Sequence, residues 1–402
     1  MNNQEYINAG SGVLMNTYSR LPLAIVKGEG CRVWDGDGKE YLDFVAGIAV
    51  NSVGHCHPKV VKALQEQART LIHCSNLYWI PGQGEVGELL VKITGLARIF
   101  FCNSGAEANE GALKLARKYA KLKGHPERFA VITMERSFHG RTLATLTATG
   151  QAKVQKGYEP LPNGFCYVPY NDFDAVAAAT TEKTCAVLLE PVQGEGGVIV
   201  PNAEYIQKLA AFCRERDILL IFDEVQTGIG RTGKFFAHEH FGVRPDILTM
   251  AKALGGGGPV GAFMATEEVA SAFVPGDHGT TFGGNPLMMA AAKATLDVVL
   301  EEKLVENSAA MGEYLTAELK KLQARFPLIR EIRGLGLIIG VECADAVGPV
   351  QEMCLQRGLM IGAAGPNVLR LVPPLIIDKN DVDRALAILT MSLEQYQKGV
   401  KA

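Results

Sequence analysis

Between residues 58 and 290, short apolar runs alternate with stretches of helical periodicity. The runs contain aliphatic and β-branched residues without polar alternation, which is typical of strands buried on both faces of a parallel sheet. Strands are expected at residues 99–102, 129–134, 186–190, 218–223, 247–250 and 261–265. The alternation predicts an α/β fold with a mainly parallel sheet that is covered by helices.

The two ends of the chain carry different patterns. Residues 1–50 predict an arm and a small hairpin, in which residues 31–34 and 41–44 flank the turn Asp35-Gly-Asp-Gly38. A helix is expected near 286–303, and residues 304–402 mix helices with short strands, including 332–342 and 369–371, as an α+β unit would. We therefore expect an arm and hairpin at 1–50 that joins the smaller domain, a large domain at 51–290, and a small α+β domain at 291–402.

Composition narrows the class of protein. The chain has 402 residues, of which 48% are hydrophobic and 21% charged, so about two globular domains are expected. A net charge of −3 without a long basic run argues against nucleic acid or an anionic membrane as partners. Neither a secretory signal nor an apolar stretch of about 18 residues is visible. Nine cysteines without a C-x-x-C motif favour reduced thiols in the cytoplasm.

The strongest chemical signal is the pair Asp223 and Lys252, each at the end of an apolar run. Ligands of parallel sheets bind beyond the carboxyl ends of the strands, so both side chains should face one crevice. A buried carboxylate can hold a protonated pyridine nitrogen, and a desolvated lysine can form a Schiff base. Pyridoxal phosphate enzymes need both groups. The four glycines Gly255–Gly258 after Lys252 argue against a surface lysine.

Three further segments follow expected strands. The turn at Ser104-Gly105 opens a helix, so its free N–H groups could bind a phosphate, or it could be an ordinary capped helix. In Ser137-Phe-His-Gly-Arg141 the aromatic ring could stack on a flat cofactor and the arginine could bind a carboxylate. The alternative is that the phenylalanine belongs to the core and the arginine to the surface, without a ligand. Glu195 lies on a glycine-rich loop, where a solvated acid is the alternative.

Two other motifs do not support a site. Residues 228–234 fit a P-loop up to Lys234, but Phe235 stands where a magnesium-binding Ser or Thr is needed. Gly54-His-Cys-His-Pro58 has no second ligand pair at a zinc-like spacing, so we expect a structural turn and no metal site.

With these segments assembled, the chain resembles the class III (ω-amino acid) pyridoxal phosphate-dependent aminotransferases along nearly its whole length. The matching segments are Tyr18-Ser-Arg-Leu-Pro-Leu23, Gly28-Glu-Gly30, Gly54-His-Cys-His-Pro58, Ser104-Gly-Ala-Glu-Ala-Asn-Glu110, Phe138-His-Gly-Arg141, Glu190-Pro-Val-Gln-Gly-Glu195, Phe222-Asp-Glu-Val-Gln226, Gly230-Arg-Thr-Gly233, Ala251-Lys-Ala253, Thr280-Thr-Phe-Gly-Gly-Asn-Pro286 and Arg370-Leu-Val-Pro-Pro374. The resemblance implies the pyridoxal phosphate transferase fold type I, with a seven-stranded sheet in the large domain, and a homodimer with a shared active site.

The resemblance also implies a role for each site residue. Lys252 would be the catalytic lysine that binds the cofactor, and Asp223 would pair with its pyridine nitrogen. The other cofactor contacts would be Ser104, Gly105 and Ala106 at the phosphate, Phe138 on the ring, Gln226 near the ring hydroxyl, and Thr281 reaching the phosphate from the partner subunit. Some relatives have a hydroxyl residue where Ala106 stands, which implies one phosphate hydrogen bond fewer. The substrate-binding residues would be Arg141, Glu195, Thr280 and Arg370.

For the reaction, the resemblance implies transfer of the distal amino group of N2-acetylornithine to 2-oxoglutarate, giving N-acetylglutamate 5-semialdehyde and glutamate in arginine biosynthesis. Arg141 would hold the remote α-carboxylate of the donor. Arg370 would bind the 2-oxo acid, with Glu195 masking it during the first half-reaction. Ile48 stands where ornithine-specific relatives look to have a tyrosine, which favours an acylated α-nitrogen. Succinylornithine, ornithine, 4-aminobutyrate or N-acetyl-lysine as donor, a decarboxylase or aminomutase, and a non-catalytic binding role remain alternatives.

Overall fold

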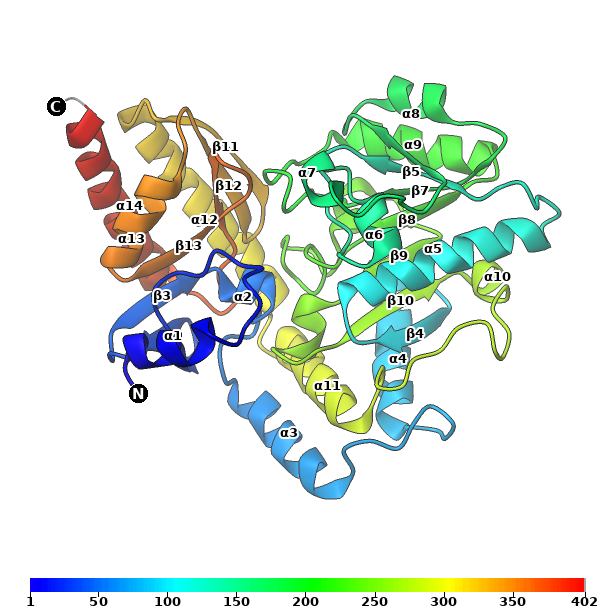
Figure 1. Ribbon diagram of the computed structural model, residues 1–402, viewed down its shortest axis with the longest axis horizontal. Coiled ribbons are helices and arrows are strands. Elements are labelled where there is room, and N and C mark those ends of the chain that lie inside the picture. The colour runs from blue at the N-terminus through cyan, green and yellow to red at the C-terminus, as the bar shows by residue number, and fades with distance from the viewer. Residues whose placement is uncertain (401–402) are drawn as a thin grey trace.

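Two β-sheets organise the molecule, and Figure 1 shows them side by side. The computed structural model describes residues 1–400. The larger sheet has seven strands in the order β4 (Arg98–Cys102), β10 (Gly261–Ala265), β9 (Ile247–Met250), β8 (Leu219–Asp223), β7 (Thr184–Leu189), β5 (Ala130–Met134) and β6 (Phe165–Val168). The strands from β9 to β6 are parallel, and β10 runs antiparallel to both of its neighbours. The prediction of a mainly parallel sheet is confirmed, and β6 is an additional strand.

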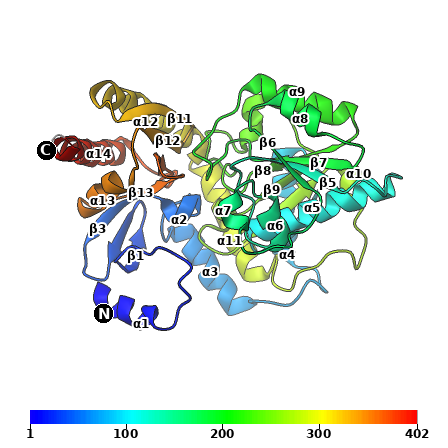
Figure 2. The same cartoon turned by 45° about the horizontal axis from the view of Figure 1, so that its top comes forward.

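Alternate residues of the central strands face opposite sides of the larger sheet. Ala186 and Leu188 of β7 pack on the side of α5 (Gly105–Leu122), whereas Val187 and Leu189 pack on the side of α8 (Phe173–Ala179) and α9 (Ala203–Glu215). Figure 2 shows these helices around the sheet. Burial on both faces explains why the strands read as uninterrupted apolar runs.

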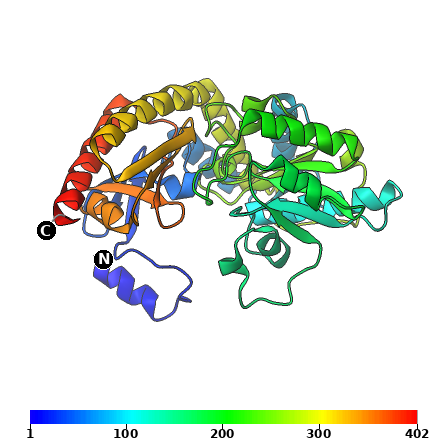
Figure 3. The same ribbon diagram turned by 90° about the horizontal axis from the view of Figure 1, so that it is seen from above.

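The smaller sheet joins the two ends of the chain. Its order is β1 (Ile25–Glu29), β2 (Arg32–Asp35), β3 (Glu40–Phe44), β13 (Leu359–Ala363), β14 (Val368–Leu371), β12 (Ile338–Cys343) and β11 (Ile329–Leu335). The N-terminal hairpin enters it through the parallel pair β3–β13. In Figure 3, α12 (Leu304–Arg325) and α14 (Lys379–Val400) lie side by side on one face of this sheet. The limits at residues 50 and 290 remain a prediction.

One sequence-based expectation for this sheet is wrong. Residues 332–342 do not form one strand but parts of two antiparallel strands, β11 and β12. Gly336 turns the chain between them with a φ of +52°, and a side chain there would collide with the backbone of Thr232 and Gly233.

The remaining helices connect and cover the sheets. They are α1 (Asn3–Ser11), α2 (Ala46–Ala49), α3 (Pro58–Thr70), α4 (Pro81–Thr94), α6 (Leu143–Ala148), α7 (Ala152–Gln155), α10 (Glu267–Ala270), α11 (Pro286–Glu301), α13 (Gly348–Gln356), and the 3₁₀ helices η1 (Ala237–Phe241) and η2 (Lys252–Gly255). The helix expected near 286–303 is therefore α11. One continuous apolar core extends from the β9 and β10 side of the larger sheet to the helices of the smaller sheet.

A buried arginine lies where the two sheets meet. Arg231, in the loop after β8, is only 1% exposed. Its Nη1 donates hydrogen bonds to the carbonyl oxygens of Leu337 and Pro373, and its Nη2 donates to Ser52 Oγ at 3.1 Å. No carboxylate pairs with it within the described residues, and burial lowers the pKa of Arg231 to about 9. The resemblance of residues 228–234 to a P-loop thus falls on a segment that connects the two sheets.

Each histidine of the Gly54–Pro58 segment lies beside an acidic side chain, His55 beside Asp43 and His57 beside Glu302. His55 Nε2 lies 2.7 Å from Asp43 Oδ2, and His57 caps α3 by accepting a hydrogen bond from the Lys59 N–H. Among residues 1–400 no group of three potential metal-ligating side chains is assembled, and no helix is long and apolar enough to cross a membrane.

Candidate active site

A cavity of about 520 Å³ opens at the carboxyl ends of β8 and β9, a size suited to a small ligand. Nine of the predicted site residues line it: Ser104, Gly105, Ala106, Phe138, Arg141, Glu195, Asp223, Gln226 and Lys252. Because these residues come from five separate loops that follow strands of one sheet, the parallel topology is what brings them together. Their individual roles remain predictions.

Lys252 stands at the first position after the short link that follows β9. Its φ of +42° lies in the left-handed region, which is costly for a residue with a side chain and occurs most often at functional sites. Burial lowers the pKa of its amine; Glu195, Asp223 and Glu190 oppose this shift, while Arg370 reinforces it. A lysine in this environment more readily gives up its proton and becomes nucleophilic.

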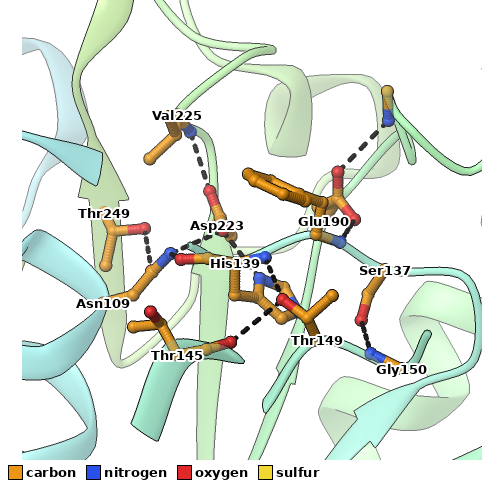
Figure 4. Close-up of polar contacts among 12 residues, drawn as sticks. Asn109, Ser137, His139, Thr145, Thr149, Gly150, Glu190, Asp223, Val225 and Thr249 are labelled. Atoms are coloured by element: carbon orange, nitrogen blue, oxygen red, sulfur yellow. Dashed lines mark hydrogen bonds and ion pairs between the residues drawn. The ribbon is translucent and has the colours of Figure 1, made fainter. Parts of the chain in front are cut away.

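Asp223 is 3% exposed and is held by three donors (Figure 4). Its Oδ2 lies 2.7 Å from Nδ1 of His139 and accepts a hydrogen bond from Asn109 Nδ2 at 2.8 Å. Its Oδ1 accepts a hydrogen bond from the Val225 N–H at 3.0 Å. Thr249 in turn donates to Asn109 Oδ1, which orients that amide. The carboxylate is thus fixed in one position before any ligand arrives.

Among residues 1–400, Asp223 is the one hydrogen-bond partner of the His139 ring. Its Nε2 is buried and makes no hydrogen bond within the described chain. The Nδ1 side of the ring is thus committed to Asp223, and the Nε2 side is enclosed without a hydrogen bond.

Glu190 is a second buried carboxyl group beside this network. Its Oε2 accepts a hydrogen bond from the Phe138 N–H and its Oε1 accepts one from the Gly194 N–H. Burial raises the pKa of Glu190 to about 7, the negative charge of Asp223 adds to the shift, and His139 opposes it. The two hydrogen bonds tie the Phe138 segment to the loop that carries Glu195.

The Ser104–Ala106 segment forms the beginning of α5. Ser104 caps the helix by accepting a hydrogen bond from the Glu107 N–H, and the first helical hydrogen bond runs from the Ala108 N–H to the Ser104 carbonyl. The N–H groups of Gly105 and Ala106 precede this bond and line the cavity. Such a helix start suits a phosphate.

Arg370 does not itself line the cavity, but it connects to two residues that do, Glu195 and Gln226. Arg370 Nη1 pairs with Glu195 Oε1 and also donates to Gln226 Oε1 at 3.1 Å. Gln226 Nε2 donates to Glu195 Oε1 at 3.2 Å. Burial alone would raise the pKa of Glu195, but the charge and hydrogen bond of Arg370 outweigh it and lower that pKa.

Arg141 has a different environment from Arg370. It is exposed, and its guanidinium carbon lies 5.5 Å from the centre of the Phe138 ring. Within the described residues it forms no ion pair with a carboxylate of the chain. The two arginines therefore differ in availability: Arg370 is occupied by Glu195, and Arg141 is free to bind an acid.

Thr280 and Thr281 lie outside this cavity. They line a separate surface groove with Leu77, Trp79 and Phe100, and Asn103 Nδ2 donates to Thr280 Oγ1 at 3.3 Å. Ile48, from which acyl preference was inferred, is 44% exposed and does not line the cavity, although Val50 does. Within a single chain, none of Thr280, Thr281 and Ile48 lines the cavity in which its predicted role would be played.

The sequence interpretation gave no role to His139, Asn109 or Thr249, and it did not connect Gln226 with Glu195. His139 and Asn109 lie within two segments of the sequence analysis, Ser137–Arg141 and Ser104–Glu110. Their polar side chains beside the predicted site residues were the signal that could have identified them. Their contacts with Asp223 join positions 84 and 114 residues apart, which no local pattern reveals.

Comparison with known proteins identifies the family. The model of the family "Aminotransferase class-III" matches residues 14–393. The chain belongs to the class III aminotransferases. It is 52% identical to the acetylornithine aminotransferase of Caldanaerobacter subterraneus subsp. tengcongensis over 385 residues, covering 96% of this chain and 98% of that protein.

Solved structures agree with this family. An acetylornithine aminotransferase from Elizabethkingia anophelis has a TM-score of 0.88 and 36% identity, covering 98% of this chain and 100% of that one. An ornithine aminotransferase from Toxoplasma gondii, whose active site held pyridoxal phosphate at partial occupancy, has a TM-score of 0.95 and 34% identity, covering 99% and 96%. This chain is a pyridoxal phosphate-dependent aminotransferase.

The residues of the cavity fit this cofactor. Asp223 offers an immobilised carboxylate for a pyridinium nitrogen, the start of α5 offers N–H groups for a phosphate, and Lys252 offers an amine whose pKa is lowered by desolvation. Phe138, partly buried on the same cavity wall, can contact the face of a planar ring.

Proposed function

We propose that this enzyme transfers the distal amino group of N2-acetylornithine to 2-oxoglutarate, giving N-acetylglutamate 5-semialdehyde and glutamate in arginine biosynthesis. The observation that carries the proposal is the pair of arginines, one free at Arg141 and one masked at Arg370 by Glu195. The 52% identity to a protein named acetylornithine aminotransferase supports the choice of donor.

When bound, pyridoxal phosphate supplies the electron sink that makes loss of a proton from the substrate carbon feasible. Asp223 would keep the pyridine nitrogen protonated by accepting its hydrogen bond. Lys252 would remove the proton from the substrate carbon and return it elsewhere, because its amine is the base that the cavity places at that point. Ser104, Gly105 and Ala106 would hold the phosphate, and Gln226 would lie near the ring hydroxyl.

The two substrates would use the arginines in turn. In the first half-reaction the distal amine of the donor reacts, so its α-carboxylate lies far from Lys252, where Arg141 would bind it. In the second, the carboxylate of 2-oxoglutarate next to the reacting carbon would bind Arg370, after the Glu195 side chain moves away. Thr280 would contribute to substrate binding.

We further propose a cytoplasmic homodimer. All nine cysteines are free thiols, as expected in a reducing compartment. Leu77, Tyr78, Trp79 and Phe282 expose large apolar side chains near Thr280 and Thr281. Covering this surface with a second subunit would bury them and would bring Thr281 to the phosphate of the partner's site.

A donor panel tests the assignment. N2-acetylornithine, N2-succinylornithine, ornithine, N-acetyl-lysine and 4-aminobutyrate are each supplied with 2-oxoglutarate, and glutamate release is followed. Acetylornithine should have the highest kcat/KM, by about tenfold or more over ornithine, as expected from the 52% identity to a protein named acetylornithine aminotransferase. Equal or faster use of ornithine contradicts the donor assignment. Release of carbon dioxide without any 2-oxo acid indicates a decarboxylase instead.

A further inference from the structure

Two arginines of the smaller sheet stand in one cross-strand row. Arg333 of β11 is opposite Gly340 of β12, and Gly340 is opposite Arg370 of β14. Directly opposed residues of antiparallel strands project from the same face of a sheet. Arg333 and Arg370 therefore project on the same side, with a glycine between them that leaves a gap.

The loop that carries Glu195 fills this gap. Val198 lies over Gly340 so closely that a methyl group on Gly340 would come within 2.9 Å of Val198 Cβ. On one side of the gap, Arg370 binds the Glu195 carboxylate. On the other side, Arg333 Nε donates to the carbonyl oxygens of Gly197 and Val198 at 3.0 and 3.1 Å, and its Nη2 donates to Gly197 at 2.8 Å.

Arg333 itself has little freedom. Its side chain is 12% exposed, and Nη1 pairs with Glu331 and Glu342 on the two strands of its own hairpin. The loop is closed at its base by two hydrogen bonds between Gln193 and Ile199. The guanidinium thus connects a fixed hairpin to the backbone of a short, closed loop, two residues from Glu195.

We propose that Arg333 is a positioning residue for the choice between the two substrates: by holding the Gly197 and Val198 carbonyls it keeps the loop where Glu195 reaches Arg370. This inference rests on the proposed alternation of Glu195 and a substrate carboxylate at Arg370. With the backbone held, only the Glu195 side chain has to move when a 2-oxo acid binds. Releasing the backbone lowers the fraction of molecules in which Arg370 is masked.

The test measures the masking directly. Glutarate, a dicarboxylate that cannot react, is titrated into the holoenzyme by calorimetry. Arg333→Gln should bind glutarate about three- to tenfold more tightly than the wild type, because apparent affinity rises with the fraction of molecules in which Arg370 is available. In single-turnover experiments, the same variant should react more slowly with acetylornithine relative to glutamate.

Three variants sharpen the result. Arg333→Lys keeps the positive charge beside Glu342 but cannot donate to two carbonyls at once, so it should resemble Arg333→Gln. Gly340→Ala should act in the same direction by displacing Val198, without altering either arginine. Arg330→Gln removes an exposed arginine from the same strand and should match the wild type.

Glu195→Gln serves as the reference for an unmasked Arg370. If it shifts glutarate affinity and donor preference while the Arg333 and Gly340 variants do not, Arg333 has no positioning role. If Glu195→Gln shifts neither, the proposed alternation of substrates is itself wrong. Equal loss of both half-reactions in Arg333→Lys, with unchanged glutarate affinity, would also overturn the inference, because it indicates a general structural role.

Discussion

At the residue scale, the site depends on a few buried ionisable groups whose neighbours are fixed. Lys252 is partly buried, strained at φ +42°, and flanked by charges of both signs. Asp223 is held by three donors from separate segments. Holding reactive groups in place before substrate arrives reduces the reorganisation required during the reaction.

The linkage of the cofactor to Lys252 can be tested chemically. Borohydride reduction of the yellow protein should fix the cofactor to the peptide that contains Lys252. Lys252→Ala should bind the cofactor without becoming labelled, and its transamination rate should fall about a hundredfold to ten-thousandfold, since it loses the base. Lys293→Ala, which removes a surface lysine paired with Asp297, should keep both label and rate. A label on any other lysine would refute the assignment.

Glu190 should make the stability of the cofactor-free protein depend on pH. An unfolded glutamate titrates near 4.5, and burial raises the pKa of folded Glu190 to about 7. The folded state thus binds the extra proton between these values, so this contribution is present at low pH and is lost as pH rises through 7. Its size is on the order of 3 kcal/mol at most, at about 1.4 kcal/mol per pKa unit.

Urea unfolding from pH 5 to 8 measures this contribution. The free energy of unfolding of the wild type should fall across this range relative to that of Glu190→Gln, which cannot titrate. Parallel pH profiles for the two proteins would show that Glu190 does not titrate in this window.

At the element scale, each of the two sheets supplies one of the arginines that we propose to bind substrate carboxylates. Arg141 follows β5 of the larger sheet and is exposed, whereas Arg370 lies within β14 of the smaller sheet and is 4% exposed. The two guanidinium groups therefore belong to different sheets, Arg141 to the loop after β5 and Arg370 to β14. Under the proposed function, the distance between a donor's reacting amine and its carboxylate would select one arginine or the other.

Removing Arg141 should affect only donors that carry a remote carboxylate. For Arg141→Ala, kcat/KM with acetylornithine should fall about tenfold to a hundredfold, mainly through KM, because a charged hydrogen bond worth about 1.5–3 kcal/mol is lost. N-acetylputrescine, which is acetylornithine without that carboxylate, is the matched donor and should lose little. An equal fall for both donors would assign Arg141 a structural role.

At the scale of the whole molecule, the surface beside the Thr280 and Thr281 groove is unusually apolar. Trp79 is fully exposed, and Leu77 is 86% exposed. Large exposed aromatic side chains at the centre of a patch are the residues that contribute most to binding in protein interfaces.

Trp79→Glu should therefore weaken dimerisation. Loss of a central tryptophan contact worth about 2 kcal/mol or more raises the dimer dissociation constant by roughly thirtyfold. Light scattering after size-exclusion chromatography reports the assembly, and activity should fall as dimers dissociate because Thr281 leaves the partner's site. Leu122→Glu, an exposed leucine at the end of α5, is the control. An unchanged dimer in Trp79→Glu would show that the interface lies elsewhere.

Sequence reasoning succeeded where chemistry and topology coincide. Asp223 and Lys252 were recognised because Asp223 ends one apolar strand and Lys252 closely follows another, and parallel strands present their ends to one cavity. Strand β6 was missed because Cys166 and Tyr167 are exposed at the sheet edge, so it lacks the apolar run of a central strand. The pairing of Arg333, Gly340 and Arg370 depends on strand register, which an unaligned sequence does not specify.

The contacts of Arg231 require distant parts of the chain to fold together. Within residues 1–400 its guanidinium donates only to Ser52, Leu337 and Pro373, which come from distant parts of the chain. A fragment that ended before residue 300 would contain the cation without two of its three acceptors, and the complementary fragment would contain bare carbonyls. Neither fragment can complete its own interior, so splitting the gene there should yield two pieces that are insoluble apart and become stable only when produced together.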